Sequence, residues 1–146
     1  MATFERHVEV NWQGGLMDGH GEAKAGTGAF DLPVTFASLI GEPAGKTSPE
    51  ELMAAAHAAC YAMALNATLG AKKASAERTV VSARIEADLG TGIKIHASHL
   101  TATVYGLKGI EASEFEGVAQ DAVKACPVSN AYRGSLQITL DAKVVG

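Results

Sequence analysis

Residues 47–70, TSPEELMAAAHAACYAMALNATLG, form the stretch that decides the fold. Its beginning predicts a helix N-terminus. Ser48 is a good N-cap, Pro49 suits the first helical position, and Glu51 completes an S-x-x-E capping box. After Pro49 no Pro or Gly occurs before Gly70, so we expect the helix to end there.

The body of this helix lacks the polar face of a surface helix. Residues 52–65 are apolar or small, with the exception of His57. A helix of this kind is either a membrane span or the centre of a folded core. The stretch is short and alanine-rich for a span and has no basic flanks. We therefore predict a central helix enclosed by other elements, and no membrane partner.

Length and charge restrict the class of protein. The chain has 146 residues, enough for a sizeable core, and we predict a single domain over residues 1–146. Its net charge of −4 argues against a nucleic-acid surface. No apolar stretch follows a basic N-terminus, so we expect no signal peptide and a cytoplasmic location. In that reducing compartment, two cysteines do not favour a static structural disulfide.

Three short strands are predicted before the central helix. Residues 5–12 alternate, residues 21–25 suit a short edge strand, and residues 30–36 form a third strand. Pro33 restricts this third strand to a sheet edge or a strand entry. We expect residues 38–46, rich in Gly and Pro, to be a loop.

The second half of the chain predicts a hairpin, two helices and a last strand. The expected elements are an antiparallel hairpin at 79–89 and 93–105, a helix at 113–126 with a capping box from Ser113 to Glu116, a short helix at 128–133, and a strand at 135–145. Together with the first half, this order predicts an α+β fold with antiparallel sheet rather than a doubly wound α/β fold.

The two cysteines lie on elements that can meet. Cys60 is midway along the central helix, and Cys126 ends the second helix immediately before Pro127, which predicts a bend. If the helices pack, the sulfurs can approach to disulfide distance. That arrangement suits a peroxide-reducing thiol, which becomes a sulfenic acid and condenses with a second thiol. The alternative is that both cysteines are small buried hydrophobic residues.

Two segments, TSPEELMAAAHAACYAMAL and KACPVSNAYRG, resemble the signature segments of the OsmC/Ohr family of thiol-dependent hydroperoxide reductases. The resemblance implies an intertwined homodimer, with antiparallel sheets wrapped around long central helices and active sites at the subunit interface. It implies that Cys60 is the peroxidatic cysteine and Cys126 the resolving cysteine. Glu50 matches a glutamate that orients a catalytic arginine in the family. No cofactor and no metal is implied.

The chain departs from the family at that arginine. OsmC-type members resemble FASRFEG before the central helix, whereas this chain has FASLIGE, with Leu39 at the arginine position. Ohr-type members carry the arginine in the glycine-rich turn after the first strand, where His20 is the candidate cation here. Arg133 matches an arginine of the Ohr-type segment CPYSNATRG and is the best substitute by position. The alternative for Arg133 is a surface or interface ion pair.

His57 lies three residues before Cys60, so the two share a helical face. The pair is compatible with a nucleophile and its base, or with half of a metal site. We favour a hydrogen-bonded core or interface histidine. No further close ligand pair is expected, because His96 and His99 are predicted to lie on opposite faces of their strand.

These observations predict an enzyme. Cys60 reduces an organic hydroperoxide, Cys126 resolves the oxidised sulfur, and a dithiol reductant recycles the pair. The apolar helix around Cys60 favours hydrophobic peroxides. The alternative is a binding or sensing module that kept the fold and lost efficient turnover together with the arginine.

Overall fold

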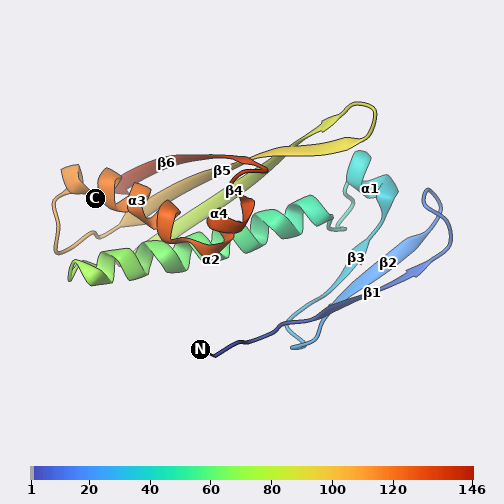
Figure 1. The fold of residues 1–146 in the computed structure, drawn as a ribbon, viewed down its shortest axis with the longest axis horizontal. Coiled ribbons are helices and arrows are strands. Elements are labelled where there is room, and N and C mark those ends of the chain that lie inside the picture. The colour runs from blue at the N-terminus through green and yellow to red at the C-terminus, as the bar shows by residue number, and fades with distance from the viewer. Residues whose placement is uncertain (1) are drawn as a thin grey trace. The chain divides into compact units, whose positions relative to one another are not determined.

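The computed structural model describes residues 2–146, which form two compact units that divide between residues 52 and 53 (Figure 1). The first unit holds a three-stranded sheet, and the second holds another three-stranded sheet with its helices. This mixture of sheets and helices confirms the predicted α+β class. A single domain over residues 1–146 stays a prediction.

The first unit is a small antiparallel sheet in the order β1 (Val8–Gln13), β2 (His20–Ala25), β3 (Asp31–Val34). The expectation of an edge strand at 21–25 is wrong, because β2 is the central strand. Its small residues Gly21, Ala23 and Ala25 alternate on the buried side. Pro33 lies on the edge strand β3, as its missing N–H requires.

A short helix, α1 (Phe36–Ile40), occupies part of the predicted loop. Thr35 is its N-cap, and the Thr35 hydroxyl accepts from the Ser38 N–H at 3.0 Å. The sequence pattern did not predict this helix, because residues 38–46 are rich in Gly and Pro, which favour a loop. Leu39 lies in α1 and is half-buried.

The long helix α2 (Pro49–Ala71) begins where the capping pattern predicts. The Glu51 N–H donates to the Ser48 hydroxyl at 3.1 Å, which confirms Ser48 as the N-cap. The second half of the predicted capping box is wrong. The Glu51 carboxylate accepts from the Thr47 hydroxyl at 2.6 Å, rather than from the N-cap backbone.

The predicted end of α2 at Gly70 is also wrong by a short distance. The helix runs past Gly70 to Ala71, and Lys73 adopts the left-handed conformation with φ of 59°. The Ala74 N–H then donates to the Leu69 carbonyl at 2.9 Å, the six-residue bond of a Schellman motif. Gly70 is thus accommodated as an ordinary helical residue.

The second unit contains β4 (Arg78–Leu89), β5 (Ile93–Tyr105), α3 (Ala112–Ala125), α4 (Pro127–Tyr132) and β6 (Gln137–Val145). The sheet order is β4-β5-β6. β4 and β5 are antiparallel as predicted, but β5 and β6 are parallel, which corrects the expectation of a fully antiparallel sheet. The reason is the connection: α3 and α4 carry the chain back along the sheet between the two strands.

A β-bulge in β5 reverses the face of the sheet to which the side chains before it point. Glu86 pairs with Ala97 and Ala87 pairs with Ile95, so His96 is an extra residue without a partner in the register. As a result His96 and His99 both approach Glu86, with nitrogen–oxygen distances of 3.7 and 3.5 Å. The prediction that the two histidines lie on opposite faces is therefore wrong.

The core of the second unit joins α2, α3 and the sheet (Figure 1). Its buried members include Tyr61, Leu65 and Leu69 of α2, Leu100, Ala102 and Val104 of β5, and Phe115, Val118, Ala119 and Ala122 of α3. These side chains recur every three or four residues on the helices and every second residue on the strand, as a core between helices and a sheet requires.

In a single chain, α2 is buried on one side, and its enclosure by other elements stays a prediction. Its buried residues are His57, Tyr61, Leu65 and Leu69, each four residues from the next. Met63, on another side, is 74% exposed. By length and composition α2 is also the one helix among residues 2–146 that could cross a membrane, so shortness does not exclude a span.

α3 begins one residue earlier than predicted and uses a different cap. The N-cap is Glu111, whose N–H donates to the Glu114 carboxylate at 2.8 Å. The predicted pair of Ser113 and Glu116 does not cap the helix, because Ser113 already lies within it. Cys126 follows α3 and is the N-cap of α4, so it lies at the bend that Pro127 predicts.

Candidate active site

The two cysteines meet within the second unit. Cys60 projects from the middle of α2, and Cys126 lies at the corner between α3 and α4. Both are free thiols, and they hydrogen-bond to each other. Cys126 is fully buried in the core, whereas Cys60 is half-buried. The pair thus has one sulfur that faces an opening and one that is shielded behind it.

Backbone amides of α4 serve both sulfurs. The Val128 N–H donates to Cys60, and the Ser129 N–H donates to Cys126 Sγ at 3.4 Å. Such donors favour the thiolate form of a cysteine. Burial acts in the opposite direction and raises the pKa of the Cys60 thiol, and the neighbouring Cys126 raises it further. Among residues 2–146 of a single chain, no cation acts on the Cys60 pKa.

An apolar groove of about 520 Å³ runs beside Cys60. Its walls come from α2, the end of α3 and the start of α4. The lining residues are Cys60, Met63, Ala64, Ala67, Thr68, Ala71, Ala125 and Pro127. A groove with one polar hydroxyl and a reactive sulfur at its wall can bind a hydrophobic molecule next to that sulfur.

His57 lies one turn before Cys60 and is completely buried. Its Nδ1 hydrogen-bonds with the Ser98 hydroxyl at 2.6 Å, and its Nε2 with the Ser129 hydroxyl at 2.8 Å. The Tyr132 ring packs edge-on against the imidazole at 5.2 Å between centroids. Burial lowers the pKa of His57, so the ring is neutral at neutral pH.

These bonds decide between the interpretations of His57. A general base or a metal ligand needs a free ring nitrogen, and both nitrogens are engaged by serine hydroxyls. The hydrogen-bonded core histidine is therefore confirmed. Residues 2–146 contain no group of three or more His, Cys, Asp or Glu side chains that could hold a metal ion.

Arg133 lies at the C-terminal end of α4 and is exposed. Its guanidinium donates to the Asn130 side chain and to the Val123 carbonyl, the latter at 3.5 Å. These bonds tie Arg133 to α3 and α4 rather than to either sulfur. A catalytic role for Arg133 stays a prediction.

Two further candidates, Glu50 and His20, belong to the first unit. Glu50 lies in the first turn of α2, and its Oε1 atom is buried without a hydrogen-bond partner. An unpaired buried carboxylate oxygen is costly, so this atom suits a hydrogen-bond donor or a cation. A role for Glu50 in orienting a catalytic arginine stays a prediction.

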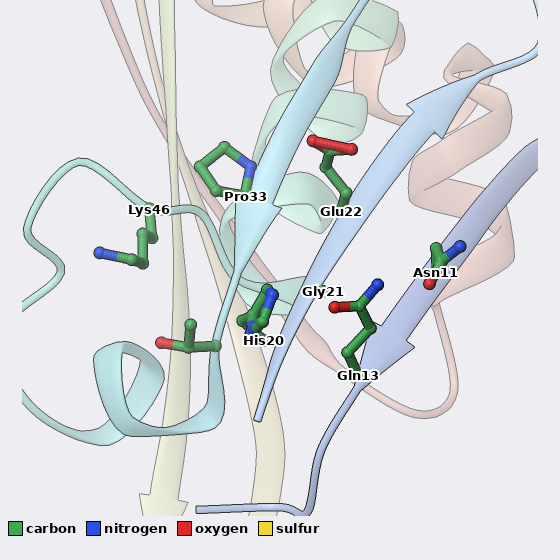
Figure 2. A pocket seen from close by; sticks show the side chains of 8 residues that line it. Asn11, Gln13, His20, Gly21, Glu22, Pro33 and Lys46 are labelled. Atoms are coloured by element: carbon green, nitrogen blue, oxygen red, sulfur yellow. The ribbon is translucent and has the colours of Figure 1, made fainter. Parts of the chain in front are cut away.

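His20 begins β2 and lines a pocket of about 410 Å³ on the first unit (Figure 2). Figure 2 shows Gln13 of β1 beside His20, with Glu22 farther along β2 and Lys46 on the loop before α2. The pocket therefore carries charges of both signs. A role for His20 at the sulfurs stays a prediction.

Sequence reasoning missed the partners of His57 and the amides of α4. Ser98 and Ser129 are fully buried polar residues, 41 and 72 positions away from His57. One observation pointed to Ser98: it shares the core face of β5 with Leu100, where a hydroxyl needs a partner. Nothing in the local sequence marked Val128, because its contribution is a backbone N–H.

The family model described as OsmC-like protein matches residues 41–141. Among curated proteins, "Peroxiredoxin OsmC" of Escherichia coli is 33% identical over 141 residues, covering 95% of this chain and 96% of that protein. "Organic hydroperoxide resistance protein OhrA" of Bacillus subtilis is 35% identical over 100 residues, covering 65% of this chain and 66% of that protein.

A solved structure extends the likeness to the fold. The organic hydroperoxide resistance protein OsmC of Legionella pneumophila, also described as a predicted redox protein, superposes with a TM-score of 0.75 at 26% identity. The match covers 99% of this chain and all of that one. The likeness to these proteins thus covers both the sequence and the arrangement of the helices and strands.

Proposed function

The chain belongs to the OsmC-like protein family, and we propose that it is a thiol-dependent peroxidase that reduces organic hydroperoxides. The observation that carries this proposal is the hydrogen-bonded pair of free thiols, Cys60 and Cys126, beside an apolar groove. The names of the relatives, peroxiredoxin and organic hydroperoxide resistance protein, support the same reaction class.

The first step uses Cys60 because it is the sulfur that borders the groove. Its thiolate attacks the terminal oxygen of the hydroperoxide, the O–O bond breaks, and the released alkoxide takes a proton to leave as an alcohol. Cys60 becomes a sulfenic acid, so the sulfur loses the two electrons that the peroxide gains. The Val128 N–H, which donates to Cys60, favours the thiolate that starts this step.

The second step uses Cys126, the buried partner. Its sulfur attacks the Cys60 sulfenic acid, an S–S bond forms, and the hydroxyl group leaves as water with the thiol proton. A dithiol reductant then reopens the disulfide by exchange and is itself oxidised. Cys126 is the neighbouring thiol that acts on Cys60, so it is the proposed attacking group. A cytoplasmic location fits this cycle, since dithiols are kept reduced there.

Hydrophobic hydroperoxides are the proposed substrates. The groove is lined by alanine and methionine side chains, and Thr68 is its only hydroxyl-bearing member. The alkyl or aryl group of an organic hydroperoxide is removed from water when it enters such a groove, which favours binding. Hydrogen peroxide has no apolar group, so burial in the groove does not favour its binding.

The proposed active form is a homodimer. On α2 the apolar Met63 is exposed in the single chain, and Ala59 and Ala67 are exposed with it. A contiguous exposed apolar surface marks an interaction site. Sedimentation is the measurement: we expect a stable dimer, and a stable folded monomer with full activity would contradict it.

The second candidate function is a binding or sensing module with weak turnover. Two observations favour it: Leu39 stands where OsmC-type members carry an arginine, and burial raises the pKa of Cys60. Without a nearby positive charge, fewer thiolates are available at neutral pH. Such a module would bind an apolar ligand in the groove beside Cys60.

One assay separates the two functions. Purified protein receives cumene hydroperoxide and a dithiol reductant, and turnover of the wild type is compared with that of Cys60→Ser and Cys126→Ser. We expect Cys60→Ser to abolish turnover, and Cys126→Ser to consume one peroxide and stop as a sulfenic acid that dimedone labels. Wild-type turnover equal to that of Cys60→Ser would exclude the enzyme and favour the binding module.

A further inference from the structure

His57 connects three elements of the second unit through a single buried side chain. It belongs to α2, one turn before Cys60, and it bonds to Ser98 on β5 and to Ser129 on α4. A neutral imidazole has one donor and one acceptor nitrogen, so one serine donates to the ring while the other accepts from it. The ring is therefore fully satisfied and fixed in orientation.

The bond to Ser129 acts at the turn that serves the sulfurs. The Ser129 side chain is held by His57, while the Ser129 backbone N–H donates to Cys126 at 3.4 Å. The preceding amide, that of Val128, donates to Cys60. Two consecutive amides of α4 thus contact the two sulfurs, and the second of them belongs to the residue that His57 anchors.

A second contact fixes the far end of α4 to the same helix. The Tyr132 hydroxyl donates to the Met53 carbonyl of α2 at 2.9 Å, and the Tyr132 ring packs against His57. His57 and Tyr132 thus both tie α4 to α2, the helix that carries Cys60.

We infer that His57 is a positioning residue for the sulfur chemistry: through Ser129 it holds the first turn of α4 so that two amides stay aimed at Cys60 and Cys126. This inference rests on the proposed peroxidase function. His57 does not take a proton from either cysteine, because both of its nitrogens are bound to serines. Its effect reaches the sulfurs through the placement of the backbone.

The reaction needs this placement at both steps. A thiolate at Cys60 must form before the O–O bond breaks, and the Val128 N–H favours that anion. Cys126 must then displace water from the Cys60 sulfenic acid, and the Ser129 N–H, which donates to Cys126, holds the attacking sulfur in position. If α4 shifts, both donors are lost together, and the sulfenic acid survives long enough to be oxidised further.

The test compares four variants with the wild type. Ser129→Ala removes the bond to His57 and keeps the backbone amide. His57→Leu removes both ring bonds and keeps most of the volume, and His57→Gln restores one donor and one acceptor. Tyr61→Phe is the matched control, because it removes a buried hydrogen bond from α2 to the Ala119 carbonyl, which does not involve α4.

Two measurements are made on each variant. The first is the rate of Cys60 alkylation by iodoacetamide as a function of pH, which needs no peroxide. The second is the rate at which the sulfenic acid becomes a disulfide, read as competition with dimedone by mass spectrometry. For Ser129→Ala and His57→Leu we expect the alkylation midpoint at higher pH and disulfide formation about fivefold slower, the effect of one lost hydrogen bond.

Partial recovery in His57→Gln and unchanged values in Tyr61→Phe would support positioning over general stability. Unchanged midpoint and unchanged disulfide rate in Ser129→Ala would overturn the inference, and this conservative variant is expected to fold even if His57→Leu does not. If the wild type forms no disulfide with cumene hydroperoxide, the peroxidase proposal fails instead. The alkylation profile then still decides whether His57 controls the environment of Cys60.

Discussion

The two faces of β5 border histidines in opposite kinds of environment: His57 of α2 on the inner face and His99 of β5 itself on the outer face. On the inner face, Ser98 binds the fully buried His57, whose second partner is also a hydroxyl. On the outer face, His99 bonds to Thr139 at 2.7 Å and approaches the exposed Glu86. Burial lowers the pKa of His57, whereas on the outer face the His99 hydrogen bond lowers the pKa of Glu86.

The comparison teaches that histidines on opposite sides of one sheet can have different roles, one as a buried structural anchor and the other as a surface hydrogen-bond partner. On the inner face the imidazole must be neutral and fully bonded, because a lost bond leaves a buried polar atom unsatisfied. On the outer face water replaces any lost partner, so the pairs contribute little. Substitution and pH should therefore affect the two faces very differently.

The largest expected effect is that of His57→Ala. This change leaves two buried serine hydroxyls without their partner and opens a cavity, so we expect the free energy of unfolding to fall by about 3–5 kcal/mol. Urea unfolding monitored by circular dichroism measures it. If the free energy of unfolding falls no more than it does for a substitution at an exposed residue, water or a rearranged serine replaces the hydrogen bonds of the ring.

The next effect is the pH dependence of stability, because His57 on the inner face and Glu86 on the outer face change protonation in different pH ranges. The His57 pKa in the folded protein lies below its ordinary value of 6.5, so the unfolded chain binds more protons. The stabilising effect of the neutral ring is thus complete above pH 6.5 and is lost as the pH falls toward the folded pKa.

The Glu86 contribution has a different window. Its carboxylate has a folded pKa below 4.5, so its stabilising effect is present above that pH and disappears as the pH falls through the folded pKa. We expect the stability difference between wild type and His57→Gln to shrink as the pH falls below 6.5, and that between wild type and Glu86→Gln only as the pH falls below 4.5. Urea midpoints across this range test both. Overlapping windows would contradict the assignment of the two faces.

The smallest expected effect is that of His99→Ala, the outer-face match to His57→Ala. This substitution removes the bond to Thr139 and the approach to Glu86 at a site that water can reach. We expect the free energy of unfolding to change by less than about 1 kcal/mol. A larger loss, measured in the same urea series, would mean that the outer face is covered in the active assembly.

Much of the fold was predictable because its signals are local. The N-cap Ser48 lies next to the helix that it starts, and Pro127 lies next to the bend at Cys126. Alternation along residues 79–89 and 93–105 likewise predicted a hairpin, whose pairing needs only a short turn. Errors of one to three residues, such as expecting Gly70 where Lys73 adopts the left-handed conformation that ends α2, arise because the residue best suited to a position is not always the residue that occupies it.

Other features depended on contacts that no local pattern carries. The parallel pairing of β5 with β6 follows from the path of α3 and α4, and the bulge at His96 follows from the register of a partner strand. The bulge alone places His96 on the same face as His99. Side chains of a strand alternate between the two faces, and one extra residue shifts this alternation by one position.

By itself, the sequence determined the kinds of elements, their approximate bounds and the two cysteines on which the chemistry depends. Helix caps, alternation and the residues around Cys60 and Cys126 are fixed within a few positions of one another along the chain. The tertiary structure alone decided that two hydroxyls far from His57 occupy both of its nitrogens, and that two amides of α4 reach the sulfurs. Hydrogen bonds depend on distance and direction in space, and only the folded chain sets those for groups that are remote in sequence.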